Sequence, residues 1–381
     1  MTRRALPFNM LPRHLYIHVP FCGRRCSYCD FSIAVRRTVP VTAYVDAIAR
    51  ELEVRFSSAG SWEVDTLYLG GGTPSQLGGT GVARLVGALR RHVALAPGAE
   101  VTLEANPDDI TIEDAASWRA AGVTRLSIGA QSFDDRALTW MHRTHDAGRI
   151  AAAVQSARSA GFTDFSLDLI FALPEALQRD WHRDLAMALA LAPTHLSLYG
   201  LTIEHGTPLA RWRDRGVALE APDERYEQEF LLAHELVSGA GFEHYEVSNF
   251  GRPGYRARHN SAYWRHVPYA GVGPAAHGYD GTRRRWNVAA YEAWRRVVAA
   301  SRDPLAGMEV LTPEQREAER VYLGLRTSDG LVLDGSTPGQ IQRWLDEGWG
   351  TMANGRLRLS PLGWLRLDAL AGSLTMAGSH Y

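Results

Sequence analysis

The chain has 381 residues, and its 41 basic and 42 acidic side chains give a formal net charge of -1 at pH 7. It is longer than one compact domain usually is, and its balanced charge disfavours nucleic acid or a membrane surface as the main partner. It contains no apolar stretch long enough to span a membrane, and residues 1–14 have no apolar core like that of a signal peptide. We therefore expect a cytoplasmic protein whose partners are small molecules or other proteins.

Short β-rich segments alternate with helical segments through the first two hundred residues. The expected strands cover 15–19, 66–70, 100–105, 125–130, 164–171 and 195–201, and the expected helices cover 41–56, 80–93, 112–121, 147–160 and 181–191. Strands that alternate with helices indicate a parallel sheet, and six such units fall short of the eight in a closed barrel. This pattern predicts an α/β fold with an open partial (β/α)6 barrel.

The pattern changes after about residue 205. Aromatic residues, histidines and arginines become dense between Tyr245 and Trp294, and helical segments follow at 313–325 and 337–347. Residues 356–359 and the apolar run after them resemble the hairpin and helix of a small winged-helix module. We predict an N-terminal segment at 1–14, a barrel at 15–245, and a smaller, mainly α C-terminal domain at 246–381.

The cysteines of the chain, Cys22, Cys26 and Cys29, lie within eight residues. Clustered thiols in a reducing compartment are more typical of metal binding than of disulfides. Iron–sulfur clusters with four irons are usually held by four thiolates, so three cysteines leave one iron open to another ligand. The alternative is a zinc site completed by a histidine such as His18, but zinc sites usually combine two cysteine pairs across a longer loop. The spacing favours an iron–sulfur cluster.

Polar and glycine residues stand where the predicted strands end. In parallel β/α folds, ligands bind at the carboxyl ends of the strands, so residues at these positions are candidates for function. The candidates at the strand ends are Gly71, Gly72, Thr73, Glu104, Gln131 and Asp168. We expect them to converge with the cysteines on one rim of the barrel.

Together these motifs resemble the radical S-adenosylmethionine (SAM) superfamily, in its branch of oxygen-independent coproporphyrinogen III dehydrogenases and the related heme chaperones of the HemW family. The matching segments, in family order, are YIHVPFCGRRCSYCDF at 16–31, GGGTPS at 70–75, LEANP at 103–107, SIGAQSF at 127–133, HRTH at 142–145, DLIFALP at 168–174 and HNSAYW at 259–264.

The resemblance implies a [4Fe-4S] cluster on the three cysteines and SAM on its open iron. SAM supplies the carbon-radical chemistry of this superfamily, and the protein orients it and excludes water. Tyr16 and Tyr28 are implied to flank the adenosine, and Thr202 is a weaker candidate for the same ligand. The residues implied to meet the methionine end and the polar groups of SAM are Gly71, Gly72, Thr73, Glu104, Gln131, Arg143 and Asp168.

Two features favour the heme chaperone branch. The dehydrogenases carry a fourth cysteine where this chain has Phe31, and they have a longer segment ahead of the cysteine motif than the 21 residues found here. The HNxxYW signature starts at His259, which the resemblance implies as an axial heme ligand. His277 is a second candidate, and residues 283–285 offer three arginines to the heme propionates.

The resemblance therefore implies a protein that binds heme and transfers it to an acceptor protein. A coproporphyrinogen III dehydrogenase is the alternative. The sequence leaves open whether SAM is cleaved, which protein accepts heme, and whether two copies form a homodimer.

Overall fold

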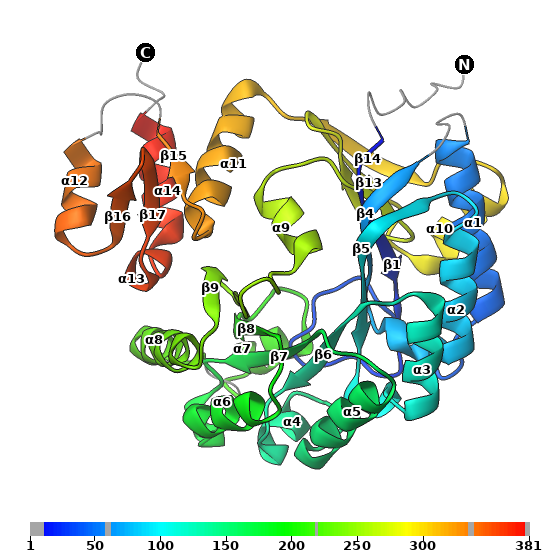
Figure 1. The fold of residues 1–381 in the computed structure, drawn as a ribbon, viewed down its shortest axis with the longest axis horizontal. Helices are drawn as coiled ribbons and strands as arrows, with labels where there is room; N and C mark the ends of the chain where they lie inside the picture. The colour runs from blue at the N-terminus through cyan, green and yellow to red at the C-terminus, as the bar shows by residue number, and fades with distance from the viewer. Residues whose placement is uncertain (1–10, 58–61, 218–219, 334–338, 378–381) are drawn as a thin grey trace.

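The computed structural model describes residues 11–57, 62–217, 220–333 and 339–377. Within them, one nine-stranded sheet forms the centre of the molecule, in the order β11-β1-β4-β5-β6-β7-β8-β10-β9 (Figure 1). Its six middle strands are parallel neighbours and match the six predicted strands. They are β1 (His14–Val19), β4 (Glu63–Gly71), β5 (Ala94–Ala105), β6 (Arg125–Gln131), β7 (Phe165–Phe171) and β8 (His195–Gly200). The open partial barrel is confirmed.

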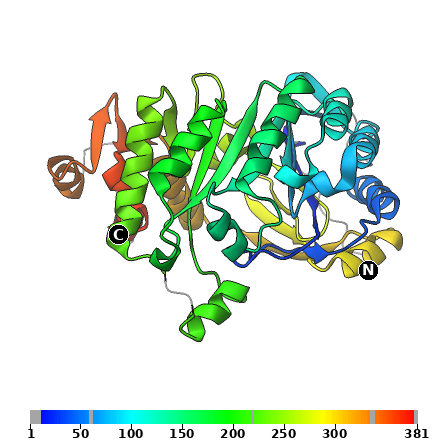
Figure 2. The same ribbon diagram turned by 90° about the horizontal axis from the view of Figure 1, so that it is seen from below.

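The predicted helices cover the convex face of this sheet, as Figure 2 shows from below. They are α1 (Val41–Phe56), α2 (Gly78–Leu89), α3 (Ile112–Ala121), α5 (Ala147–Ser159) and α6 (Trp181–Ala190). A short helix that we did not predict, α4 (Asp135–Trp140), follows β6. None of the helices in the described ranges is long and apolar enough to cross a bilayer.

The strands are apolar on the face toward the helices and polar on the concave face. Leu15, Ile17 and Leu69 are fully buried in the core between sheet and helices. The residues between them point the other way, because side chains alternate along a strand. The strands pair so that Tyr16 lies beside Tyr68. This register places rows of polar side chains across the inside of the barrel.

Short strands extend the sheet at both edges. β11 (Ala270–Val272) returns from the C-terminal half of the chain and pairs in parallel with β1. At the other edge, β10 (Asn249–Gly251) and β9 (Glu243–Glu246) pair antiparallel next to β8. Strand β9 spans the domain boundary that we predict at 245/246, and that division stays a prediction.

The rest of the chain is built from helices and small antiparallel sheets. The helices not yet named are α7 (Pro208–Asp214), α8 (Asp223–Gly239), α9 (Arg258–Trp264), α10 (Tyr291–Ala299), α11 (Pro313–Arg326), α12 (Gly339–Asp346), α13 (Pro361–Trp364) and α14 (Leu367–Ala377). One small sheet contains β12 (His277–Tyr279), β13 (Arg283–Asn287) and β14 (Leu305–Val310), and another contains β15 (Leu331–Val332), β17 (Arg356–Leu359) and β16 (Gly350–Ala353). The hairpin expected near residue 356 is thus present as β16 and β17. The first two residues of the helix expected at 337–347, and most of segment 1–14, lie outside the described residues.

A buried carboxylate joins the C-terminal half to the barrel. Glu51 on α1 is fully buried and accepts hydrogen bonds from the backbone N–H of Gly273 (3.0 Å), the side-chain amide of Asn287 (2.7 Å) and the indole N–H of Trp294 (2.7 Å). Arg55 on the next turn of α1 completes the set with an ion pair of 2.6 Å. A buried charge needs such partners because water cannot solvate it.

Candidate functional site

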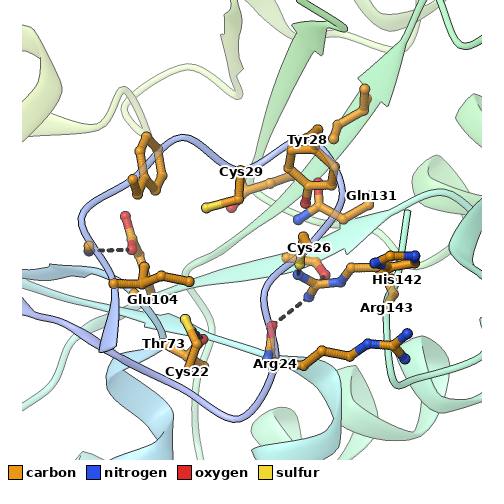
Figure 3. A pocket seen from close by; sticks show the side chains of 18 of the residues that line it. Cys22, Arg24, Cys26, Tyr28, Cys29, Thr73, Glu104, Gln131, His142 and Arg143 are labelled. Carbon is orange, nitrogen blue, oxygen red and sulfur yellow. Dashed lines mark hydrogen bonds between the residues drawn. The ribbon is translucent and has the colours of Figure 1, made fainter. Parts of the chain in front are cut away.

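A pocket opens where the cysteine loop faces the carboxyl ends of β4 to β8 (Figure 3). Of the residues predicted to hold the cluster or SAM, all but Tyr16 line it: Cys22, Cys26, Cys29, Tyr28, Gly71, Gly72, Thr73, Glu104, Gln131, Arg143, Asp168 and Thr202. These residues come from the loop after β1 and from successive strand ends. The sheet thus gathers residues up to 180 positions apart in the chain.

Backbone hydrogen bonds hold the cysteine loop. Ser27 donates to the carbonyl of Met141 (3.1 Å) and accepts from the backbone N–H of Leu209 (2.8 Å). Arg25 donates from its guanidinium to the carbonyl of Cys29 (3.1 Å). The loop is therefore shaped by its neighbours, and Figure 3 shows the three cysteine side chains around one space in the pocket.

All three cysteines are free thiols. Burial raises the pKa of Cys22 to about 11 and also raises the pKa of Cys29. The Cys22 sulfur lies 3.3 Å from the Thr73 hydroxyl, and the Cys26 sulfur lies 3.5 Å from a guanidinium N–H of Arg143. Because a thiol must lose its proton to bind iron, bound iron would offset the burial that favours the protonated thiols of Cys22 and Cys29.

The zinc alternative finds little support in the donors. His18, its proposed fourth ligand, has both ring nitrogens in hydrogen bonds, one with the Tyr16 hydroxyl (3.1 Å) and one with the carbonyl of Ser32 (2.9 Å). Among the described residues, no three His, Cys, Asp or Glu side chains meet closely enough to hold one metal ion. The described donors therefore do not form a site for a single metal ion.

Glu104 reaches the pocket from the end of β5. Its carboxylate accepts hydrogen bonds from the Tyr68 hydroxyl (2.8 Å) and the backbone N–H of Gly71 (3.0 Å). Burial raises its pKa to about 7, although both hydrogen bonds favour the charged form. A cation such as the ammonium of an amino acid would restore the charge of this carboxylate.

The glycines of the turn after β4 are needed for close packing within the protein. A Cβ atom on Gly72 would lie 2.7 Å from backbone atoms of Pro20 and Phe21, which lead into the cysteine loop. Gly71 has a φ of 112°, and a Cβ there would lie 2.5 Å from the His18 ring. The turn and the cysteine loop therefore pack backbone against backbone, which places Thr73 beside Cys22.

Arg143 is half-buried beside the cysteines. Its guanidinium donates to the side-chain carbonyl of Asn106 and to the backbone carbonyl of Gly129 (3.0 Å) as well as to Cys26. No carboxylate pairs with it in the described part of the chain, so its charge is available to an anionic group in the pocket. Asn106 also lines the pocket, and our sequence reading missed it although it directly follows β5.

A network of hydroxyl groups holds Asp168 on β7. Its carboxylate accepts hydrogen bonds from Ser127 (2.8 Å) and Ser166 (2.9 Å), and burial raises its pKa. Ser166 also bonds to His195 (2.9 Å). The sequence reading missed these partners, which occupy matching register positions on neighbouring strands. The network fixes the position of the Asp168 carboxylate at the pocket.

The structure does not bring Tyr16 to the pocket lining. Its ring stacks on Tyr68 (centroids 6.1 Å apart) inside the barrel, and its hydroxyl bonds to His18. Tyr199, at the end of β8, instead presents a 44% exposed ring to the pocket. Tyr28 and Tyr199 are thus the tyrosines of the lining. Our sequence reading did not single out Tyr199, although it stands at a strand end.

The residues predicted to hold heme lie outside the pocket lining. His259 is buried on α9, and His277 is exposed on β12. The arginines expected to meet propionates are paired with acidic side chains: Arg283 with Asp280 (2.7 Å), Arg284 with Glu319 (2.8 Å) and Arg285 with Asp303 (2.6 Å). These three guanidinium groups therefore already have carboxylate partners.

A cysteine loop, a glycine turn and charged strand-end residues around one pocket of a partial barrel define a site of the radical SAM type. A family model described as the radical SAM superfamily matches residues 16–188. Over 330 residues, the chain is 41% identical to a protein named heme chaperone HemW from Mycobacterium tuberculosis H37Rv, covering 86% of this chain and 85% of that protein. The chain belongs to the HemW family of the radical SAM superfamily.

Other relatives extend this likeness. A Bacillus subtilis protein named heme chaperone HemW is 32% identical over 83% of this chain and 84% of its own length. Radical S-adenosyl methionine domain-containing protein 1, mitochondrial, from Bos taurus is 36% identical over 84% of this chain and 74% of its own length. The solved structure of coproporphyrinogen III oxidase (HemN) from Escherichia coli covers 97% of this chain and 91% of its own, with a TM-score of 0.78 at 22% identity. That likeness shows the shared fold.

Proposed function

We propose that this protein is a heme chaperone that carries a [4Fe-4S] cluster with exchangeable SAM, binds heme, and transfers it to an acceptor protein. Relatives named heme chaperone HemW, which match most of the chain, support this proposal. Cys22, Cys26 and Cys29 would hold three irons of the cluster. Bound SAM would supply an electron-driven source of carbon radicals.

The residues around the cysteines have separate tasks in binding SAM. Glu104 accepts a charged hydrogen bond from the ammonium group, and Arg143 offers a positive charge to the carboxylate. Asp168 accepts hydrogen bonds from hydroxyl groups. The tyrosine rings of the lining provide flat apolar faces for the base.

The observation that carries the choice of chaperone over dehydrogenase is Phe31. It lines the pocket where the dehydrogenases have a fourth cysteine, and its ring is 60% exposed. A phenyl ring neither ligates iron nor carries a proton, but it offers a face to an apolar ring system. The site thus lacks a thiol that the dehydrogenases have and gains an aromatic surface.

The test is anaerobic reconstitution with iron and sulfide, followed by two incubations. Hemin should bind with a Soret shift and move to an apo-acceptor protein such as apomyoglobin. Incubation with coproporphyrinogen III, SAM and a reductant should yield no protoporphyrinogen IX. Catalytic yield of protoporphyrinogen IX would overturn the chaperone assignment and establish the dehydrogenase.

We propose the cytoplasm as the compartment, because three free thiols and an iron–sulfur cluster persist under reducing conditions. Size-exclusion chromatography of the reconstituted protein, with and without heme, would distinguish a monomer from a homodimer.

A further inference from the structure

The histidine of the HNxxYW signature is fully engaged inside the protein. His259 is 1% exposed, and its ring nitrogens bond to the Thr66 hydroxyl (2.7 Å) and the Tyr263 hydroxyl (2.8 Å). Its ring also stacks on Tyr68, with centroids 5.1 Å apart. An axial ligand must offer one ring nitrogen to iron, so His259 would first have to give up one of these bonds.

These contacts identify a structural task for His259. Helix α9 lies on the concave side of the sheet, between β4 and α11 (Figure 1). The Glu100 carboxylate on β5 accepts the backbone N–H groups of Arg258 (2.9 Å) and His259 (3.0 Å), which caps the start of the helix. The His259 ring then fixes the helix to β4 through Thr66. The signature histidine thus anchors α9 inside the barrel.

His277 has the opposite character. Its side chain is exposed, and neither ring nitrogen has a hydrogen bond among the described residues. The imidazole stacks on the Trp286 indole, with centroids 6.0 Å apart and an interplanar angle of 25°. A Cβ atom on Gly307 would lie 2.4 Å from this indole, so the indole packs directly on the backbone of β14. The imidazole is therefore held by its face while its nitrogens stay accessible.

The segment that follows Trp286 is joined to the cysteine loop. The His277 backbone passes directly over Gly271 of β11, which pairs with β1. Ser32 in the cysteine loop bonds through its hydroxyl to the carbonyl of Ala289 (3.3 Å) in the segment after β13, and it precedes Ile33 of the lining. The exposed ring of Phe31 belongs to the same rim. The residue that follows Phe31 is thus bonded to the segment that follows Trp286.

We infer that His277, rather than His259, is the axial ligand of the heme iron, with Trp286 and Phe31 beside it as apolar surfaces for the porphyrin. This inference rests on the proposed function, because it assigns a ligand to the heme that the chaperone would carry. Partial desolvation where its face packs on Trp286, together with the nearby Arg284, lowers the pKa of His277, which favours the neutral imidazole that ligates iron. The assignment also places the heme at the edge of the cluster pocket.

The test is hemin titration of the reconstituted full-length protein, followed by the Soret band. His277→Ala should raise the dissociation constant at least about tenfold and remove the histidine-ligated Soret position, and added imidazole should restore that position. His259→Asn should keep that Soret position but unfold at a lower denaturant concentration. His182→Ala changes an exposed histidine on the outer helix α6 and should behave like the wild type.

Each variant needs an intact iron–sulfur spectrum before its heme spectrum is compared. If His277→Ala binds hemin like the wild type, while a folded His259→Asn or His259→Gln loses the Soret band, the ligand is His259 and the inference is wrong. If the wild type does not bind hemin, the proposed function fails together with the ligand assignment. These two failures are distinguished by the wild-type titration alone.

Discussion

The variant Glu104→Gln separates two effects of this half-buried carboxylate, its effect on the stability of the fold and its role in binding SAM. In the folded protein the pKa of Glu104 is about 7, against an ordinary value of 4.5. Because the folded-state pKa is raised, Glu104 contributes stability that is fully present below pH 4.5 and is lost as the pH rises through 7. Integrated from pH 5.5 to pH 8, this difference removes about 2 kcal/mol from the free energy of unfolding of the wild type.

Glutamine at this position keeps the hydrogen bonds. Its carbonyl can accept from Gly71, and its amide N–H can donate to the Tyr68 hydroxyl, which serves as donor or acceptor. The variant has no charge to lose, so its free energy of unfolding should lack this 2 kcal/mol of pH dependence. We expect it to match the wild type near pH 5.5 and to exceed it at pH 8.

The assay is anaerobic urea denaturation of the reconstituted protein without SAM, at pH 5.5 and pH 8. The control variant Glu113→Gln removes an exposed carboxylate on α3 and should follow the wild type at both pH values. In equilibrium dialysis at pH 8, Glu104→Gln should bind SAM at least about tenfold more weakly, a loss of about 1.4 kcal/mol. Parallel pH profiles for the wild type and Glu104→Gln would refute the reasoning about burial, and unchanged SAM affinity would refute the role in binding.

Three further changes test the site and its support. Serine at all three cysteine positions should abolish the brown absorbance of the reconstituted protein, and stoichiometric zinc in anaerobically purified wild type would contradict the cluster. Gly72→Ala should lower both the iron bound per chain and the SAM affinity, because its Cβ would clash with the backbone that leads into the cysteine loop. The control Gly87→Ala on α2 has open space around the new Cβ and should leave both quantities unchanged. Glu51→Gln should lower the free energy of unfolding by about 3 kcal/mol, because it leaves the buried charge of Arg55 unpaired. Glu53→Gln at an exposed ion pair should cost at most about 1 kcal/mol, and a similar loss in both variants would contradict the role of burial.

The sequence by itself determined the barrel and most of the pocket. The helices at 41–56 and 112–121 have the predicted bounds, because continuous helical spacing and clear breakers are local signals. The strand ends could also be predicted, since Glu104 and Asp168 stand at the ends of apolar runs in the sequence. The rule that parallel strands present their carboxyl ends to one rim then brought these residues together without any knowledge of side-chain positions.

Only the tertiary structure decided what depends on distant partners. β11 has three residues, too few for a periodic pattern, and it forms a strand because β1 offers an open edge. Tyr16 stands in a matching motif, yet Tyr68 and His18 hold its ring inside the barrel. His259 and His277 look alike as candidate ligands in the sequence. Their difference arises from long-range packing. Thr66 and Tyr68, on a strand nearly two hundred residues away in the chain, bury the imidazole of His259. The imidazole of His277 instead stacks on Trp286 and keeps its nitrogens exposed.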